Sequence, residues 1–320
     1  MASKFSKLKK VLICAVLIFF GAILIIFPQR YLATCFEGLC LWAECVLPSL
    51  FPFMVITMLL IKLGAAQKAA KPFAKLSKKL KLPSAAFPLF LMSVCSGYPA
   101  GSRLVCEYCE NGLIDAKDAK KLAPLCSVCG PLFALGTVGV KAFGGNGAGV
   151  KLFCACLLSV ISTSLIYCLL CKSPVKERPT ASLIKGDGDA LFSSFYGGVT
   201  AVTVAGGFIC FFYTLSKVFT DFKIFKPLEL CFSPLFGQGA AQGLCAGLCE
   251  ATGGCFAVAA AGGFFALPIA GFLITFGGVS ILMQQLCYLN KCGVKAGFFI
   301  GFKFLQGLLS FALLCLFSLF

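Results

Sequence analysis

The chain has 320 residues, of which 59% are hydrophobic and 12% are charged, and its mean hydropathy is +0.97. Soluble domains carry about 25% charged residues, so this composition excludes an ordinary water-soluble protein. It predicts an all-α polytopic membrane protein. The net charge of +16 is explained by orientation in the membrane. The lysines cluster in short loops, and loops rich in lysine and arginine lie on the cytoplasmic side. No nucleic-acid partner is expected.

The first apolar run, residues 11–27, follows a basic stretch and reads either as a secretory signal or as a signal anchor. We favour the anchor, because no small-residue cleavage site closes the run and further apolar segments follow at once. Lys4, Lys7, Lys9 and Lys10 predict a cytoplasmic N-terminus in the cell membrane.

A second span is predicted over residues 46–63, and it returns the chain to the cytoplasm. The loop that follows carries six lysines and predicts an interfacial amphipathic helix that lies against anionic membrane lipid. These lysines are Lys68, Lys71, Lys75, Lys78, Lys79 and Lys81. Orientation and lipid contact are favoured over a ligand-binding role for them.

The next apolar stretch, residues 87–109, is interrupted by Ser-Gly-Tyr-Pro-Ala-Gly-Ser at 96–102, which no continuous helix would choose. We expect a hairpin of two half-helices that enters and leaves from the cytoplasmic face. Irregular backbone survives at membrane depth only where protein or a water-filled cavity satisfies its polar groups. The interruption therefore predicts an internal site.

The remaining chain reads as further spans around a flexible cytoplasmic linker at residues 172–190. Together with the first two spans they predict about seven transmembrane helices plus two re-entrant helical hairpins. The expected segments are 122–140 with an interruption at 127–131, 152–171, 191–219, the glycine-broken hairpin 240–261, 264–289 with an interruption at 276–280, and 297–320.

The two halves share one order of features, and span and hairpin break are separated by about 45 residues in each, as an internal repeat requires. Each half contains an odd number of spans, so the second copy must be inverted. The predicted organisation is an N-terminal anchor and outer segment at 1–45, a first repeat at 46–171, the linker at 172–190 and the inverted repeat at 191–320. Inverted repeats with discontinuous helices are typical of secondary transporters, whose substrate site lies near the bilayer midplane.

Helix ends at the interruptions supply the expected binding groups. Glu250 is the most informative residue, because it is the only charge in its apolar stretch, and an ionisable group at membrane depth indicates function; a structural or interfacial role is the alternative. The predicted substrate-binding residues are Ser96, Gly97, Tyr98, Pro99, Gly101, Ser102, Glu250, Thr252, Gly253 and Gly254. Further substrate or ion contacts are expected at Ser127, Gly130, Gly277, Gly278, Ser280 and Gln284.

Some of these polar groups have equally good structural explanations. Ser127, Ser280 and Gln284 could instead form helix–helix hydrogen bonds. Arg103 could face an anionic substrate, or it could pair with Glu107 one helical turn further on.

The motifs at 47–53 (Leu-Pro-Ser-Leu-Phe-Pro-Phe), 96–102, 129–133 (Cys-Gly-Pro-Leu-Phe) and 276–280 with Gln284, in this order, resemble the sporulation integral membrane protein YlbJ family. The resemblance runs from about residue 47 onward. It implies two nucleoside-recognition Gate domains related to concentrative nucleoside transporters, a forespore-surrounding membrane as location, and a role in moving dipicolinic acid during sporulation. The chain departs from the family at Ser127-Val-Cys129, where the family usually has Asn and Ser.

Cysteine is frequent, with 21 residues, and histidine is absent. The pairs Cys106/Cys109 and Cys126/Cys129 have zinc-site spacing, but we expect no metal site, because frequent cysteines inside apolar spans behave as small hydrophobic residues. Without histidine or acidic pairs in the spans, no enzyme activity is predicted. No cofactor is expected beyond a coupling ion, Na+ or H+.

Two function classes follow from the sequence. The first is a transporter for a small anionic or nucleoside-like solute that works by alternating access. The second is a non-transporting scaffold of the sporulation membrane that recruits partners through its basic cytoplasmic loops. Homo-oligomer formation is compatible with both.

Overall fold

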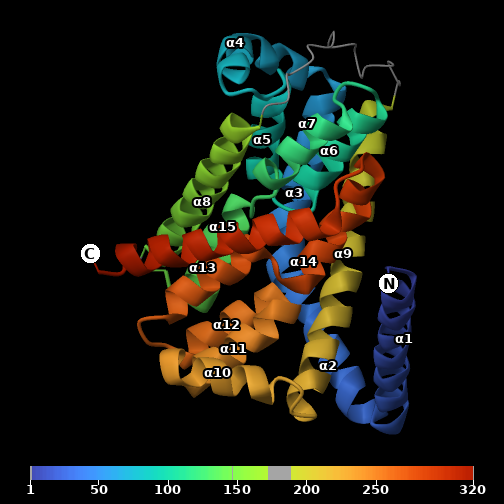
Figure 1. Cartoon of the computed structure of the whole chain (residues 1–320), viewed down its shortest axis with the longest axis vertical. Coiled ribbons are helices and arrows are strands. Elements are labelled where there is room, and N and C mark those ends of the chain that lie inside the picture. Colours follow the sequence, from blue (N-terminus) through green and yellow to red (C-terminus); the bar gives the residue numbers. More distant parts are fainter. Residues whose placement is uncertain (1, 146, 172–188, 320) are drawn as a thin grey trace.

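The computed structural model describes residues 2–145, 147–171 and 189–319, and helices joined by short turns make up this part of the chain (Figure 1). The predicted linker falls almost wholly at 172–188, outside the described residues. The helices before it are α1 (Ala2–Ile26), α2 (Pro28–Leu41), the π-helical turn η1 (Trp42–Val46), α3 (Leu47–Lys62), α4 (Ala65–Lys79), α5 (Ala86–Ser96), α6 (Ala100–Glu110), α7 (Ala116–Leu125), the π-helix η2 (Phe133–Ala142) and α8 (Ala148–Leu170).

After it come α9 (Ala190–Asp221), α10 (Lys226–Phe236), α11 (Gln238–Cys249), α12 (Ala251–Ala261), α13 (Ala266–Phe276), α14 (Gly278–Leu289), the 3-10 turn η3 (Asn290–Cys292) and α15 (Ala296–Phe317).

By length and composition, five helical segments of the described chain could cross a membrane: Pro28–Lys62, Ala148–Leu170, Ala190–Asp221, Ala266–Cys292 and Ala296–Phe317. The protein is therefore a multi-pass helical membrane protein, as the composition predicts. Two of the predicted spans are not among the five. Val11–Ile26 is a shorter apolar helix, and the stretch 122–140 is divided between α7, an irregular turn and η2.

The helix that contains the predicted second span is much longer than the sequence indicated. It begins at Pro28, whose ring fits the first helical turn because that position needs no N–H donor, and it continues through η1 and α3 to Lys62. The predicted outer segment before residue 46 is thus helical. Its Trp42 indole donates a 3.0 Å hydrogen bond to the Val202 carbonyl of α9.

The two halves present the same order of elements. A long helical segment (α2–η1–α3 or α9) is followed by a shorter helix (α4 or α10), two half-helices (α5–α6 or α11–α12), a broken helix (α7–η2 or α13–α14) and a final long helix (α8 or α15). The two short helices lie at opposite ends of the molecule, with α4 at the top of Figure 1 and α10 at the bottom.

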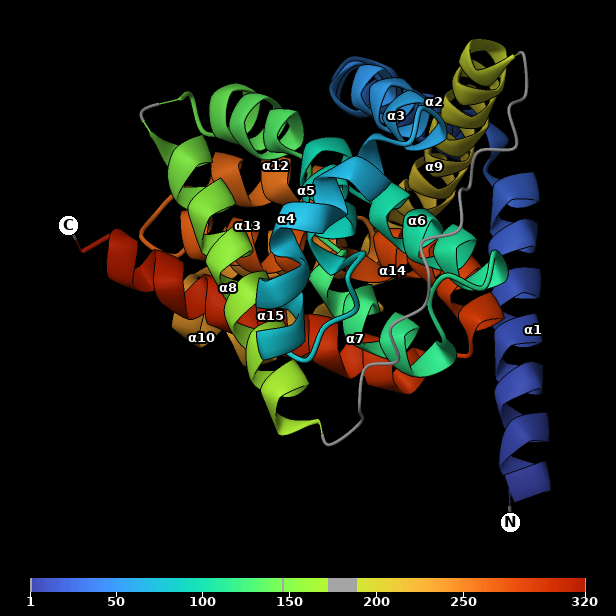
Figure 2. The same cartoon turned by 90° about the horizontal axis from the view of Figure 1, so that it is seen from above.

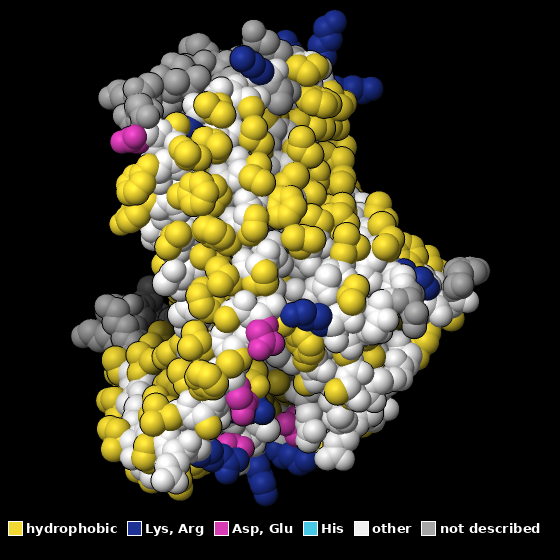
Figure 3. All heavy atoms as spheres, turned by 180° about the vertical axis from the view of Figure 1, so that it is seen from behind, with side chains coloured by type: hydrophobic (Ala, Val, Ile, Leu, Met, Phe, Trp, Pro, Cys, Tyr) yellow, Lys and Arg dark blue, Asp and Glu magenta, His cyan; other side chains and the backbone are white. Residues whose placement is uncertain are grey.

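One hydrophobic core joins residues of both halves, and α1 lies outside it (Figures 1 and 2). A smaller cluster holds α1 against α2 and α9 through Phe20, Ile23, Tyr31, Leu215 and Val218. The upper part of the face in Figure 3 is largely hydrophobic, and lysines and arginines lie at its top and bottom and also at mid-height. The hydrophobic part suits contact with lipid.

Candidate functional site

The first hairpin breaks at Gly97, between α5 and α6. Gly97 has φ +70°, which a residue with a side chain adopts only at a cost, and a Cβ there would lie 2.7 Å from the Gly130 nitrogen. A Cβ on Gly101, the second residue of α6, would lie 1.8 Å from the Cys126 carbonyl oxygen. Because neither glycine has a side chain, the hairpin can pack directly against the irregular turn between α7 and η2.

The second half repeats this arrangement. Its hairpin breaks at Glu250, between α11 and α12, and the following broken helix is interrupted at Gly277, which has φ +94°. A Cβ on Gly278 would lie 2.6 Å from the Gly247 carbonyl oxygen and 3.4 Å from the Ala251 nitrogen. In each half, the hairpin break thus lies against the break in the next helix.

Two hydrogen bonds join the first hairpin to the broken helix of the second half. The Tyr98 hydroxyl donates to the Ile274 carbonyl of α13, and the Ser102 hydroxyl donates to the Gln285 side-chain oxygen of α14 at 3.0 Å. All four residues are buried. The interruptions of both halves consequently gather in one region of the fold.

A small central cavity lies among these interruptions, with a volume of about 20 Å³. That is room for about one water molecule. Helices α3 and α9 close it with apolar side chains, and the interruptions add the polar ones. The lining residues are Val46, Leu50, Tyr98, Gly130, Phe133, Ala205, Ile209, Glu250, Thr252, Ile281 and Gln284.

Glu250 is the acidic residue of this lining, and its side chain is 1% exposed. It caps α12, since its carboxylate accepts hydrogen bonds from the Thr252 nitrogen at 2.9 Å and from the Gly253 nitrogen at 2.6 Å. A carboxylate is stabilised at a helix N-terminus by the unpaired N–H groups and the partial positive charge there. Glu250 therefore already occupies the anion-binding end of this half-helix.

A larger open cavity of about 690 Å³, which we call the vestibule, reaches Glu250 from between α9, α11 and α12. Tyr213 and Lys217 of α9 line it, and the Tyr213 hydroxyl donates a 3.2 Å hydrogen bond to Glu37. The Lys217 ammonium lies 5.8 Å from the centre of the Tyr213 ring. Glu250 lines both the vestibule and the central cavity, so it stands at the boundary between them.

The structure brings some of the expected site residues together at the cavities and gives others packing roles. Tyr98, Gly130, Glu250, Thr252 and Gln284 line the central cavity, whereas Gly253 and Gly254 line the vestibule. The remaining residues support the breaks from outside the cavity linings: Ser96, Gly97, Pro99, Gly101, Ser102, Ser127, Gly277, Gly278 and Ser280.

Three of these supporting hydroxyls are fully buried. Ser96 lies 2.6 Å from the Thr57 hydroxyl of α3, and Ser280 accepts a 3.4 Å hydrogen bond from the Gln284 amide. The Ser127 hydroxyl has no hydrogen-bond partner among the described residues. The Ser96 bond therefore joins α5 to α3, whereas the Ser280 bond lies within α14.

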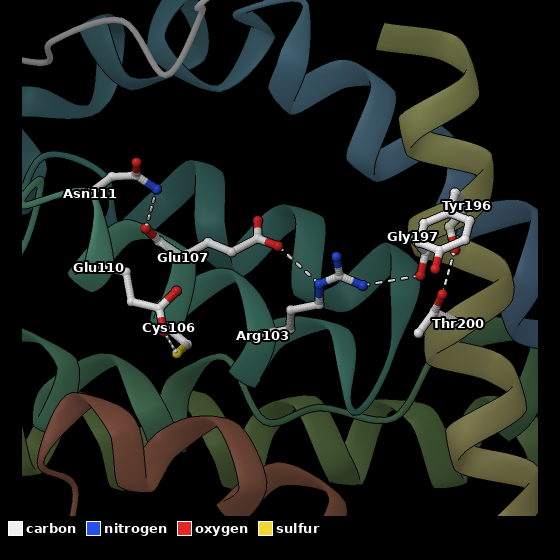
Figure 4. A network of polar contacts seen from close by, with 8 residues as sticks. All are labelled: Arg103, Cys106, Glu107, Glu110, Asn111, Tyr196, Gly197 and Thr200. Atoms are coloured by element: carbon white, nitrogen blue, oxygen red, sulfur yellow. Dashed lines mark hydrogen bonds and ion pairs between the residues drawn. The ribbon is translucent and has the colours of Figure 1, made fainter. Parts of the chain in front are cut away.

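Arg103 joins the first hairpin to α9 (Figure 4). Its guanidinium donates a 2.9 Å hydrogen bond to Glu107, one turn along α6, and a 3.0 Å hydrogen bond to the Gly197 carbonyl. Of the two roles that the sequence left open, the helical ion pair is the one observed. Arg103 thus holds α6 to α9.

Lys303 of α15 is a buried charge that the sequence analysis passed over. Its side chain is 0% exposed, and its ammonium donates a 2.8 Å hydrogen bond to the Ser127 carbonyl in the break after α7. One turn further on, the Gln306 amide donates to the Pro124 carbonyl at 3.2 Å. Lys303 is the only charge in the apolar stretch 297–320, so the rule that selected Glu250 would have selected Lys303 too.

The central cavity also contains apolar residues that the sequence did not mark as site residues. Its wall is formed by Val46 of η1, Leu50 of α3, and Ala205 and Ile209 of α9. Within the described part of the chain, no group of three or more His, Cys, Asp or Glu side chains could hold a metal ion.

The chain is similar to the sporulation integral membrane protein YlbJ of Bacillus subtilis (strain 168), with 25% identity over 255 residues. The similarity covers 70% of this chain and 60% of the relative, so the chain spans about three fifths of the relative's length. No protein-family model matches the chain, and no solved structure matches it significantly. The relative's name describes an integral membrane protein of sporulation, which agrees with the membrane location of this chain.

Proposed function

We propose that this protein is a secondary transporter that moves a small solute by alternating access between two inverted repeats. One observation carries the proposal: the chain interruptions of both halves meet at one buried cavity that contains a carboxylate. Discontinuous helices in corresponding positions, with a site where the two halves meet, are the arrangement expected of such transporters. The similarity to a sporulation membrane protein supports a role in a membrane of the sporulating cell, and the lysines of the first ten residues support a cytoplasmic N-terminus.

The sizes of the two cavities support a conformation of the transporter in which the solute site is closed and one access route to it is open. The central cavity admits about one water molecule, whereas the vestibule is several hundred cubic ångströms and ends at Glu250. A solute could enter by the vestibule and reach the central cavity once Glu250 and the tips of the half-helices move apart. The coupling ion, Na+ or H+, would be taken up in the same movement.

The lining of the central cavity favours a nucleoside-like solute over a dianion. Its wall is apolar and aromatic, while Glu250, Thr252 and Gln284 offer hydrogen bonds on one side. Among the described residues, no lysine or arginine lines it. Because Glu250 already takes the α12 N–H groups, a dicarboxylate such as dipicolinate would have to displace an acidic side chain. Dipicolinate, which the family resemblance implies, is therefore the second solute to test.

Uptake by purified protein in liposomes tests the proposal. Labelled uridine and labelled dipicolinate would be compared, and we expect saturable uptake of one of them. Glu250→Gln should lower that uptake by roughly tenfold or more, the usual worth of a hydrogen bond to a charged group. Glu229→Gln is the matched control, because Glu229 is also buried but lies on α10, 3.8 Å from Lys226, and lines neither cavity. If neither solute moves and none binds, the transporter proposal fails.

The scaffold function remains the second candidate, because Lys75, Lys78 and Lys79 present an exposed basic surface on α4. Under that function, neutralising these lysines should abolish the cellular role while Glu250→Gln has no effect. The opposite result is expected for a transporter, so one pair of variants separates the two.

A further inference from the structure

Two apolar grooves occupy corresponding positions in the two halves. The first groove has a volume of about 270 Å³, and its residues come from α4, α5, α7, α8 and the turn before α5: Leu76, Leu80, Leu82, Ala86, Phe87, Phe90, Leu125, Ile161 and Leu165. The second groove has about 200 Å³, and its residues come from α10, α11, α13 and α15: Phe232, Phe236, Leu244, Leu248, Ile269, Phe272, Phe304, Leu308 and Phe311. Each groove thus lies beside the short helix of its half.

The chemistry of both linings suits a hydrocarbon chain. Every lining residue is apolar, and both grooves are open rather than enclosed. In a membrane, an open apolar groove of this size is accessible to lipid acyl chains, which are as apolar as leucine. The short helices α4 and α10 lie at opposite ends of the molecule (Figure 1), so the two grooves lie toward opposite ends as well.

The charges beside the two grooves differ. Residues 64–82, which include α4, contain six lysines and no acidic residue. Lys75 and Lys79 are exposed and directly precede the groove residues Leu76 and Leu80, and Lys78 lies exposed between them. Beside the second groove, Lys226 and Glu229 of α10 form a 3.8 Å ion pair. The first groove therefore has a strongly basic rim, and the second has a nearly neutral one.

We propose that the first groove is a binding site for an anionic phospholipid, with one acyl chain in the groove and the headgroup phosphate against Lys75, Lys78 and Lys79. Lysines near a membrane surface attract anionic lipid, and their long side chains let the charge stay at headgroup level while the stems cover apolar surface. The second groove holds an acyl chain without selecting its headgroup. This inference stands independently of solute transport.

Lipid titrations of the purified protein, followed by native mass spectrometry, test the site. Phosphatidylglycerol and phosphatidylcholine with the same acyl chains would be compared. We expect the wild-type protein to prefer phosphatidylglycerol by roughly a hundredfold, and the triple variant K75Q/K78Q/K79Q to lose most of that preference. The matched control is K223Q/K226Q beside the second groove, which should retain it. Equal binding of both lipids by the wild type would overturn the proposal.

Two further variants separate the groove from the charges. Leu165→Trp fills the first groove and should weaken phosphatidylglycerol binding, whereas Leu308→Trp fills the second groove and should leave the preference unchanged. If Leu165→Trp has no effect while the triple variant abolishes binding, the lysines act without the groove and the site is refuted. Should the triple variant not fold, K75R/K78R/K79R keeps the charge and must keep the preference.

Discussion

The Tyr98 hydroxyl donates a buried hydrogen bond to the Ile274 carbonyl. This bond joins the first hairpin break to α13 of the second half, the helix that ends at the Gly277 break. Tyr98 also lines the central cavity, and its side chain is 6% exposed. This contact therefore links the two halves beside the candidate solute site. A movement that opens the site on this side has to break it.

Tyr98→Phe removes the donor and leaves the Ile274 carbonyl without it. We expect the free energy of unfolding to fall by about 1–3 kcal/mol, the usual cost of an unsatisfied buried polar group. Denaturation in mixed micelles measures this change. Tyr196→Phe is the control, because Tyr196 is 68% exposed. Equal stability of the two variants would show that the bond contributes nothing.

Gly101 and Cys126 support a second prediction about the first hairpin. A Cβ on Gly101 would lie 1.8 Å from the Cys126 carbonyl oxygen, so Gly101→Ala must push α6 away from the break after α7. We expect a loss of about 3 kcal/mol or more, the upper end of overpacking costs. Gly207→Ala is the matched control: it also lies in a helix, but nothing lies within 4 Å of its added methyl group. There the substitution should be neutral or stabilising, by up to about 1 kcal/mol. Thermal unfolding of both variants decides the matter, and similar losses would contradict the close approach.

Lys303 gives a prediction that separates stability from transport. Lys303→Met keeps the length of the side chain but removes the ammonium that binds the Ser127 carbonyl. The Ser127 carbonyl loses this donor, which costs about 1–3 kcal/mol, but the buried side chain no longer carries a charge to desolvate, which offsets part of that cost. We therefore expect the variant to fold and to lose solute uptake by roughly tenfold or more, the usual worth of a charged hydrogen bond.

Lys151→Met is the matched control for this change. The Lys151 ammonium also donates to a backbone carbonyl, that of Phe317 at 2.8 Å, but Phe317 is the last residue of α15, whereas Ser127 lies in the break after α7. Its substitution should leave uptake unchanged. Unimpaired uptake by Lys303→Met would show that the buried ammonium serves packing alone.

The sequence predicts the places where the helices break better than the places where they begin. Gly97 and Pro99 mark the first break, because they interrupt a long apolar run and a break in such a run has few other causes. The second hairpin was expected to break at its glycines, but Gly253 and Gly254 lie within α12, and the break falls just before them at Glu250. The helical segment before Val46 was missed. It contains Arg30, Glu37 and Glu44 and therefore looks like an outer loop, yet it packs along α9, and Trp42 is bonded to it. Such tertiary contacts leave no local pattern in the sequence.

The polar half of the candidate site was also easier to predict than its apolar wall. Glu250, Thr252 and Gln284 are conspicuous because polar groups are rare in apolar stretches. Val46 and Ile209 look like any other hydrophobic residues of a span, and only the packing of η1 and α9 brings them to the cavity. The correspondence of α10 with α4 was missed for a similar reason, since α10 has a single lysine in place of the lysine cluster that made α4 recognisable.

Ala257 of α12 offers a direct test of the vestibule as the route to Glu250. It lines the vestibule and is exposed, so Ala257→Phe adds a ring in open space without disturbing the core. We expect unchanged thermal unfolding but slower uptake, by roughly tenfold, because exposed positions away from packed contacts rarely affect stability. Ala312→Phe on the exposed side of α15 is the control for added bulk. If the vestibule is the route, only Ala257→Phe should slow uptake, and a larger solute should be slowed more than a smaller one. Equal uptake by both variants would mean that solute reaches Glu250 from another side.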